Sequence, residues 1–298
     1  MSFTADEIGS QPVTWRQAAD RGRALDRGTF LPGRRLAVVG CGTSYHMAQA
    51  FAALREARGL GEADAVVASE WRATRRYDAV VALSRSGTTT EVVRVLEGLD
   101  GDVPSVALSA VAGTPVVRAA RDAVLLEFAD ERSIVQTRFA TSALALWRAH
   151  LGDDLESVVQ AAERALLAPL PAGPDGLDHV VFLGQGWTVG LADEAALKLR
   201  EAAGARTESY PAMEYLHGPI AAAGPATLVW AFDELPAPLA GELRRVGAPL
   251  VRPSADPMAS LVLAQRLALA MAEARNLDPD HPLHLTRSVV LPATPSST

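Results

Sequence analysis

Short runs of apolar residues, many of them β-branched, recur along the first half of the chain and end near a glycine or serine. Five runs are typical of brief strands, at residues 36–39, 65–68, 79–83, 105–108 and 123–126. Segments rich in alanine and leucine follow them with apolar residues at helical spacing, and longer segments of this kind at 133–151 and 155–167 are predicted helices. This alternation predicts an α/β fold whose strands are covered on both faces.

The same pattern begins again after a segment rich in proline and glycine, residues 168–176, which we interpret as a linker. Residues 36–56 and 180–201 share an apolar strand, a Gly-x-Gly turn and an alanine-rich helix that ends in Leu-Arg-Glu, at an offset of about 144 residues. Two related α/β units are the natural interpretation, although unrelated strand-to-helix junctions also look alike. We therefore predict one unit at 1–167, with an N-terminal helical segment, and another at 177–298.

Composition narrows the class of protein. The chain of 298 residues is 49% hydrophobic and 21% charged, which is typical of a compact protein. Its net charge of −7, with arginines scattered along the chain, argues against a nucleic acid or an anionic membrane as partner. Cys41 is the only cysteine, and the most apolar long segment, 261–274, contains Gln265, Arg266 and Glu273. We expect a cytoplasmic protein without a metal site, a cofactor or a membrane span.

Hydroxyl side chains gather at two turns of the first half where a strand leads into a helix. Residues 40–44 read Gly-Cys-Gly-Thr-Ser, and residues 84–90 carry five serines and threonines around Gly87. Main-chain N–H groups at a helix start are unsatisfied and favour anions, and nearby hydroxyls donate further hydrogen bonds. Ordinary helix capping needs one hydroxyl. The pattern therefore indicates phosphate binding, without the spacing of a Walker A loop or a dinucleotide fingerprint.

Titratable residues gather in the second half. Glu194, Lys198 and Glu201 are spaced to line one helical face, and Lys198 is the only lysine of the chain. A loop-like stretch at 206–220 carries His217 among glutamates. Carboxylate and imidazole groups transfer protons near neutral pH. Spacing alone nevertheless favours a solvated, salt-bridged face with a capping histidine.

Taken together, the motifs at 40–44, 68–70, 83–91, 194–201 and 214–219 resemble the sugar isomerase (SIS) family. They are most similar to the isomerase half of glutamine-fructose-6-phosphate aminotransferases, and they cover nearly the whole chain in order. The resemblance implies two tandem αβα sandwiches with mainly parallel, five-stranded sheets. It also implies a homodimer in which both subunits build each sugar site.

The resemblance implies roles for individual residues. Glu201 matches the glutamate that moves protons between the first two sugar carbons, and Lys198 matches the adjacent catalytic lysine. His217 matches the histidine that opens the sugar ring, often donated by the partner subunit. The residues implied in substrate and phosphate binding are Gly42, Thr43, Ser44, Ser84, Arg85, Ser86 and Thr89.

Some positions depart from the family pattern. Arg85 stands where relatives carry glutamine, and its guanidinium would strengthen phosphate binding or contact another substituent. Thr88 stands where relatives often carry glutamate. Residues 284–289 resemble the closing tail of the family, but Arg287 replaces its lysine, which puts a Schiff-base role there in doubt. We expect no glutaminase domain before the first unit, and hence no glutamine-dependent synthesis.

The resulting expectation is a phosphosugar isomerase or deaminase that acts on a hexose 6-phosphate, an amino sugar above all, through proton abstraction by a glutamate. Two alternatives stay open. One is a lyase that eliminates a C3 substituent from an N-acetylhexosamine 6-phosphate, and the other is a non-catalytic sugar-phosphate sensor. The apolar segments 140–146 and 261–271 would supply either a dimer interface or part of the core.

Overall fold

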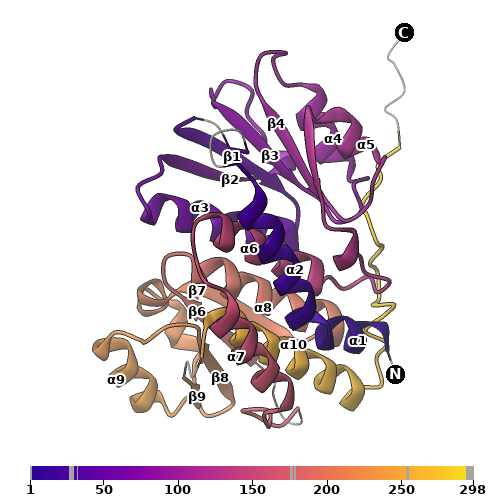
Figure 1. Cartoon of the computed structure of the whole chain (residues 1–298). Coiled ribbons are helices and arrows are strands. Elements are labelled where there is room, and N and C mark those ends of the chain that lie inside the picture. The colour runs from indigo at the N-terminus through magenta and orange to yellow at the C-terminus, as the bar shows by residue number, and fades with distance from the viewer. Residues whose placement is uncertain are drawn as a thin grey trace.

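The structure, a computed structural model, describes residues 2–26, 30–31, 33–174, 177, 179–252 and 255–292. The last two residues of the predicted linker, 175–176, therefore lie outside the described residues. Two sheets, one from each half of the chain, lie at opposite ends of the molecule with layers of helices between them (Figure 1). The predicted α/β class is confirmed.

The first sheet contains the five predicted strands, all parallel, in the order β2-β1-β3-β4-β5. Their bounds are β1 Arg35–Gly40, β2 Glu62–Val67, β3 Ala79–Leu83, β4 Ser105–Ser109 and β5 Asp122–Leu125. Alternate residues of β1 face opposite layers: Leu36 and Val38 pack with α3 (Thr43–Ala57), whereas Ala37 and Val39 pack with α4 (Thr90–Glu97). The strands are therefore covered on both faces, as the apolar runs predict.

The second sheet is also parallel, with the order β7-β6-β8-β9. Its strands are β6 His179–Gly184, β7 Arg206–Pro211, β8 Thr227–Ala231 and β9 Leu250–Val251. The expectation of five strands is wrong for the described part of this sheet, because residues 275–292, which include three prolines, run back toward the first sheet after α10 (Pro257–Ala274). The expectation of a loop-like stretch at 206–220 is also wrong in part, because its first six residues pair with β6 as β7.

The similarity between the two halves extends to the backbone. Arg35 pairs with Glu62 in the first sheet and His179 pairs with Arg206 in the second, so each pairing joins residues with the same sequence separation. Gly42 and Gly186 adopt nearly the same positive φ, 53° and 54°, which favours glycine. Each half therefore turns from strand to helix along the same path.

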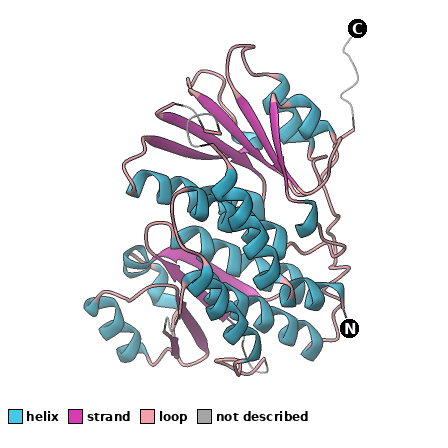
Figure 2. Ribbon diagram, viewed as in Figure 1, coloured by secondary structure: helices cyan, strands magenta, loops and turns pink. Residues whose placement is uncertain are grey.

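The helices form the remaining layers (Figure 2). Those not yet bounded are α1 Phe3–Gly9, α2 Gln11–Ala24, α5 Pro115–Ala119, α6 Arg138–His150, α7 Glu156–Leu167, α8 Thr188–Ala203 and α9 Ala237–Val246. Helix α6 begins five residues later than predicted, because the Glu131 carboxylate accepts hydrogen bonds from the main-chain N–H groups of Thr137 and Arg138 and so caps the helix there. Short 3₁₀ turns complete the fold, among them Ala68–Glu70, Glu127–Ala129, Ala212–Leu216 and Pro219–Ala222.

One apolar core runs through both halves and includes α6, α8 and α10. Every residue of 140–146 is buried, and most of 261–271 is buried as well. The structure therefore supports the alternative in which these segments form part of the core. None of the helices within the described ranges combines the length and apolarity that a bilayer-spanning helix requires. In the same ranges, no three histidine, cysteine, aspartate or glutamate side chains cluster as metal ligands do.

Helices α3 and α8 meet with unusually close backbones at Gly190. A Cβ atom added there would lie 2.4 Å from the carbonyl oxygen of His46 and 2.9 Å from the main-chain nitrogen of Ala50. The missing side chain therefore allows α8 to lie directly against α3. This contact brings the second half of the chain beside the first glycine-rich turn.

Substitution of Gly190 tests this contact. We expect Gly190→Ala to lower the free energy of unfolding by about 1–3 kcal/mol, because backbone atoms must move apart. Gly241→Ala is the matched control, since Gly241 lies inside α9 and its added Cβ meets only the end of the Arg244 side chain at 3.9 Å. The control should be neutral or stabilising by about 0.5–1 kcal/mol. Equal effects in chemical denaturation would contradict the close approach.

Candidate functional site

Three titratable side chains of α8 meet the first glycine-rich turn inside the protein. The Lys198 Nζ atom donates to Thr43 Oγ1 at 2.8 Å, lies 3.4 Å from Glu194 Oε1, and also donates to Glu201 Oε2. The Thr43 hydroxyl donates to Glu194 Oε1 at 3.3 Å. The Glu194 and Lys198 side chains are at most 1% exposed, whereas Glu201 is 20% exposed. The interpretation of these residues as a solvated face is therefore wrong.

Burial decides where the proton of this cluster is held. One ammonium faces two carboxyl groups, and removing charge from water disfavours the ionised form of the more buried one. Burial, with a smaller contribution from Glu201, raises the pKa of Glu194 to about 8. Burial works to lower the pKa of Lys198, but the Glu194 and Glu201 carboxyl groups together raise it above its ordinary value. At neutral pH the cluster holds a protonated Glu194 and a Lys198 ammonium paired with Glu201.

The two hydroxyl-rich turns lie next to each other at the carboxyl edge of the first sheet. They follow β1 and β3, which are parallel neighbours. Helices α3 and α4 leave these strands toward opposite faces of the sheet, so the crevice between the strand ends is a topological switch point. Ligands of open α/β sheets bind in such crevices. The position of both turns therefore fits a ligand site.

The second of these turns presents hydroxyls around a glycine that cannot be replaced without a clash. Gly87 has φ +65°, and a Cβ there would lie 2.0 Å from Thr114 Oγ1. Ser84 Oγ lies 3.4 Å from Thr89 Oγ1, and the Thr88 hydroxyl donates to Ser86 Oγ at 3.0 Å. Helix α4 begins directly afterwards at Thr90. The turn thus combines hydroxyl donors with the N-terminus of a helix.

The corresponding turn of the second half is already occupied by a carboxylate of the same chain. Asp233, which follows β8, accepts hydrogen bonds from the Gln185 main-chain N–H at 3.3 Å and from the Thr188 hydroxyl. Over the described residues, no carboxylate accepts from a main-chain N–H of the 40–44 turn. The first turn is therefore the one available to an external anion.

The Arg85 side chain is bonded to other segments of the chain, although its backbone lies in the second hydroxyl-rich turn. Its guanidinium is 1% exposed and donates to the carbonyl oxygens of Ser133 at 2.9 Å, Ile134 at 3.1 Å and Arg287 at 3.2 Å. It also lies 3.6 Å from Glu131 Oε2. Three carbonyls accept from the two terminal nitrogens of this guanidinium and a carboxyl group lies beside it, while its buried Nε atom has no partner among the described residues. Because its charge is already compensated by these groups, we remove Arg85 from the candidate phosphate-binding residues.

His217 is exposed at the end of the 3₁₀ turn Ala212–Leu216. Its main-chain N–H donates to the Glu214 carbonyl oxygen at 2.9 Å. Across the described ranges, no hydrogen bond joins its imidazole to Lys198 or Glu201. The single chain therefore brings together Thr43, Lys198 and Glu201 of the predicted residues, but not His217.

Sequence reasoning left one functional residue without a role. Glu194 was noted for its spacing, and the structure shows that it accepts from Thr43 and lies beside Lys198. The signal for it was the i, i+4 spacing to the only lysine among small alanines. Such spacing marks a shared helix face, but it does not tell whether that face is buried.

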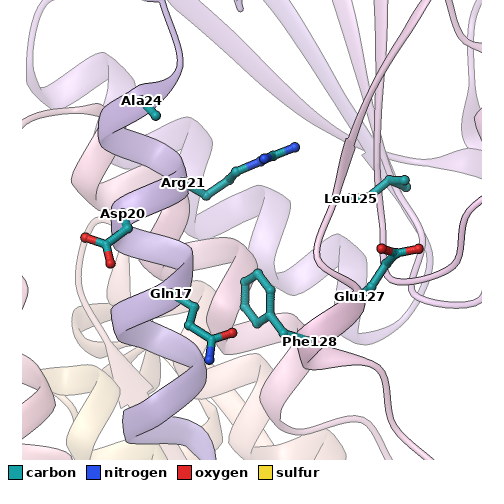
Figure 3. Close-up of a pocket in the computed structure, with 7 residues that line it drawn as sticks. All are labelled: Gln17, Asp20, Arg21, Ala24, Leu125, Glu127 and Phe128. Carbon is teal, nitrogen blue, oxygen red and sulfur yellow. The ribbon is translucent and has the colours of Figure 1, made fainter.

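A separate hollow of about 730 Å³ lies between α2 and the segment that follows β5, and the Arg21 side chain extends into it (Figure 3). It is lined by Gln17, Asp20, Arg21, Ala24, Leu125, Glu127 and Phe128. None of the predicted site residues lines this hollow, so we do not assign it as the candidate site. The candidate site is instead the crevice at the strand ends of the first sheet, described above.

Comparison with known protein families identifies a similarity in the first half of the chain. Residues 30–147, which contain both hydroxyl-rich turns, match the model of the SIS domain family. This segment is therefore similar to a SIS domain. The resemblance inferred from the motifs is thus confirmed, while the predicted second SIS domain at 177–298 stays a prediction. Helix α8, which carries Lys198 and Glu201, lies outside the matched segment.

The similarity to a longer relative extends beyond the segment matched by the family model. The chain is 27% identical over 305 aligned residues to glutamine–fructose-6-phosphate aminotransferase [isomerizing] of Methanothermobacter thermautotrophicus, which covers 86% of this chain and 52% of that relative. The chain therefore spans about half the length of this curated relative.

Two crystal structures share the fold almost throughout. Glucosamine-6-phosphate deaminase from Thermotoga maritima has a TM-score of 0.80 at 24% identity, over 97% of this chain and 100% of the other. Tagatose-6-phosphate ketose/aldose isomerase from Escherichia coli has a TM-score of 0.76 at 19% identity, over 95% and 97%. The fold is therefore that of phosphosugar isomerases and deaminases.

The proton on Glu194 predicts a dependence of stability on pH. Glu194 ionises near its ordinary pKa of 4.5 in the unfolded chain but at about 8 in the folded protein, so unfolding between these values releases a proton. The free energy of unfolding should therefore fall with rising pH, by up to about 1.4 kcal/mol per pH unit from this group.

Glu194→Gln checks this effect, because glutamine stays neutral and still accepts from Thr43. We expect the stability advantage of the variant over the wild type to grow from pH 5 to pH 8 in urea titrations. Glu97→Gln, at an exposed position of α4, should leave the pH profile of the wild type unchanged. Parallel profiles for the wild type and Glu194→Gln would show that Glu194 is ionised in the folded protein.

Proposed function

We propose that the protein is an enzyme that isomerises or deaminates a hexose 6-phosphate, with an amino sugar as the favoured substrate. The observation that carries the proposal is the hydrogen bond between Lys198 and Thr43. It joins a buried acid–base cluster to a turn suited to a phosphate. The fold shared with glucosamine-6-phosphate deaminase and tagatose-6-phosphate ketose/aldose isomerase supports the reaction class.

In this proposal the 6-phosphate is held at the first glycine-rich turn and the hydroxyls that follow β3. The N–H groups at the start of α3 and α4 favour a dianion, and hydroxyl donors complete its hydrogen bonds. The side chains assigned to phosphate and sugar binding are Thr43, Ser44, Ser84, Ser86 and Thr89, with Gly42 allowing the turn. Lys198 contacts this turn through Thr43.

Glu201 is the proposed general base. Its carboxylate is the most exposed group of the cluster and accepts from Lys198, so it faces the side from which a substrate enters. It removes the proton α to the carbonyl of the open-chain sugar, and the Lys198 ammonium stabilises the negative charge that develops on the oxygen. Return of the proton to the neighbouring carbon, with a proton passing from the C2 oxygen to the C1 oxygen, completes an isomerisation. When C2 carries an amine, the same shift gives an imine, which water hydrolyses to a ketose phosphate and ammonia.

His217 is the proposed acid–base group for opening the sugar ring, supplied by a second copy of the chain. This assignment fits its exposed position and the lack of a bond to Lys198 or Glu201 within the described part of one chain. A homodimer with shared sites is therefore part of the proposal. The described residues of one chain then contain the base and the phosphate site, and the partner supplies the imidazole.

Glu201→Gln tests the role of the base. We expect turnover to fall by at least about 100-fold, because the amide cannot accept the proton, while binding of the phosphosugar persists. The assay incubates the protein with glucosamine 6-phosphate or N-acetylglucosamine 6-phosphate and follows products by NMR in D₂O. Glu97→Gln serves as the matched surface control with wild-type turnover.

Each result of this assay has a defined meaning. A ketose phosphate with ammonia supports deamination, and exchange of the C2 proton with solvent supports isomerisation of another sugar. An alkene signal would instead identify a lyase that eliminates a C3 substituent. Binding without any chemistry in the wild type would identify a sensor, and near-normal turnover of Glu201→Gln would refute the assignment of the base.

Mixing two inactive variants tests the sharing of sites. Glu201→Gln and His217→Ala should each be inactive alone as homodimers. After unfolding and refolding together, half of the dimers are mixed and each holds one intact site, so roughly a quarter of the wild-type activity should return. Absence of any recovery, with mixed dimers verified by mass spectrometry, would place His217 in the site of its own chain.

A further inference from the structure

The C-terminal segment 287–291 runs along the turn that follows β3. The Thr90 main-chain N–H donates to the Val289 carbonyl oxygen at 3.2 Å, and the Leu291 main-chain N–H donates to Thr90 Oγ1 at 2.9 Å. Ser288 Oγ lies 3.4 Å from Thr89 Oγ1. Segments about 200 residues apart in the sequence thus lie side by side (Figure 1).

Three hydroxyl groups converge where these segments meet. Ser84 Oγ and Ser288 Oγ both lie 3.4 Å from Thr89 Oγ1. Hydrogen bonds between hydroxyls are usually 2.7–2.8 Å long. At 3.4 Å these groups satisfy one another poorly, so each is free to turn its O–H toward a common acceptor. An oxyanion could accept hydrogen bonds from all three hydroxyls. Ser288 would then be a donor that the sequence motifs do not assign.

Arg85 fixes the segment in this place. Its guanidinium donates to the Arg287 carbonyl oxygen, one residue before Ser288, and to the carbonyls of Ser133 and Ile134. The Arg287 guanidinium in turn donates to the Glu131 carbonyl oxygen and to the Asp130 carboxylate. Arg85 therefore ties the C-terminal segment to the same turn that carries Ser84.

We propose that Ser288 is a further phosphate-binding residue and that Arg85 is the residue that positions it. The C-terminal segment then forms one wall of the phosphate site. Arg85 acts through the main chain of Arg287 and does not touch the phosphate. This inference rests on the proposed function only in taking the anion to be the phosphate of the substrate.

Binding of inorganic phosphate, measured by isothermal titration calorimetry, tests the proposal without any reaction. We expect Ser288→Ala to weaken binding by about ten-fold or more, as is usual for a lost hydrogen bond to a charged group. Ser288→Thr keeps the hydroxyl and should bind with nearly wild-type affinity. Ser157→Ala removes an exposed hydroxyl on α7 and serves as the control with unchanged affinity.

A double-mutant cycle tests the role of Arg85. Arg85→Gln should weaken phosphate binding in the wild-type background but have little further effect when Ser288 is already alanine. A purely structural role would weaken binding equally in both backgrounds. Thermal unfolding shows which variants fold. If Arg85→Gln does not fold, the comparison of Ser288→Ala with Ser288→Thr still decides whether Ser288 binds phosphate.

The outcomes separate this inference from the proposed function. Unchanged phosphate affinity of Ser288→Ala, together with a loss in Ser84→Ala, would overturn the inference and leave the phosphate site intact. No phosphate binding by the wild type would overturn both the site and the inference. Loss of affinity in Ser288→Ala while Glu201→Gln keeps full turnover would support the inference and refute the proposed base.

Discussion

The hydrogen bond from the buried Lys198 ammonium to Thr43 is the constraint on which the arrangement of the site depends. An ammonium with 1% exposure is stable only where acceptors replace its lost water, and here Thr43, Glu194 and Glu201 do so. Because Thr43 starts α3 and Lys198 lies on α8, these acceptors come from both halves of the chain. The close contact of α3 and α8 at Gly190 makes this geometry possible.

Much of the fold could be predicted because apolar runs and glycine turns are local signals. The five strands of the first sheet and the turns after β1 and β3 follow from residues near each other in the sequence. Two features could not be predicted from local signals. The number of strands described in the second sheet depends on where residues 275–292 run, and the late start of α6 depends on the Glu131 carboxylate, which caps a helix six residues away.

The sequence predicted which residues belong to the candidate site, but it did not predict whether their side chains are buried or what they contact. Spacing placed Glu194, Lys198 and Glu201 on one face, but only the packing of α8 against α3 makes that face buried. Arg85 illustrates the same limit. It lies between Ser84 and Ser86, yet side chains of consecutive residues leave the backbone in different directions. Its guanidinium turns into the interior, where three carbonyls accept from it.

The Asp233 carboxylate makes the two halves unequal in their need for a ligand. In the second half, the Gln185 amide hydrogen is already bonded to a carboxylate of the same chain without any ligand. In the proposed function the first half takes its anion from solution, so ligand binding would add to the local stability of the 40–44 turn according to ligand concentration. Added protection of amide hydrogens would then be expected at the 40–44 turn and not at the corresponding turn of the second half.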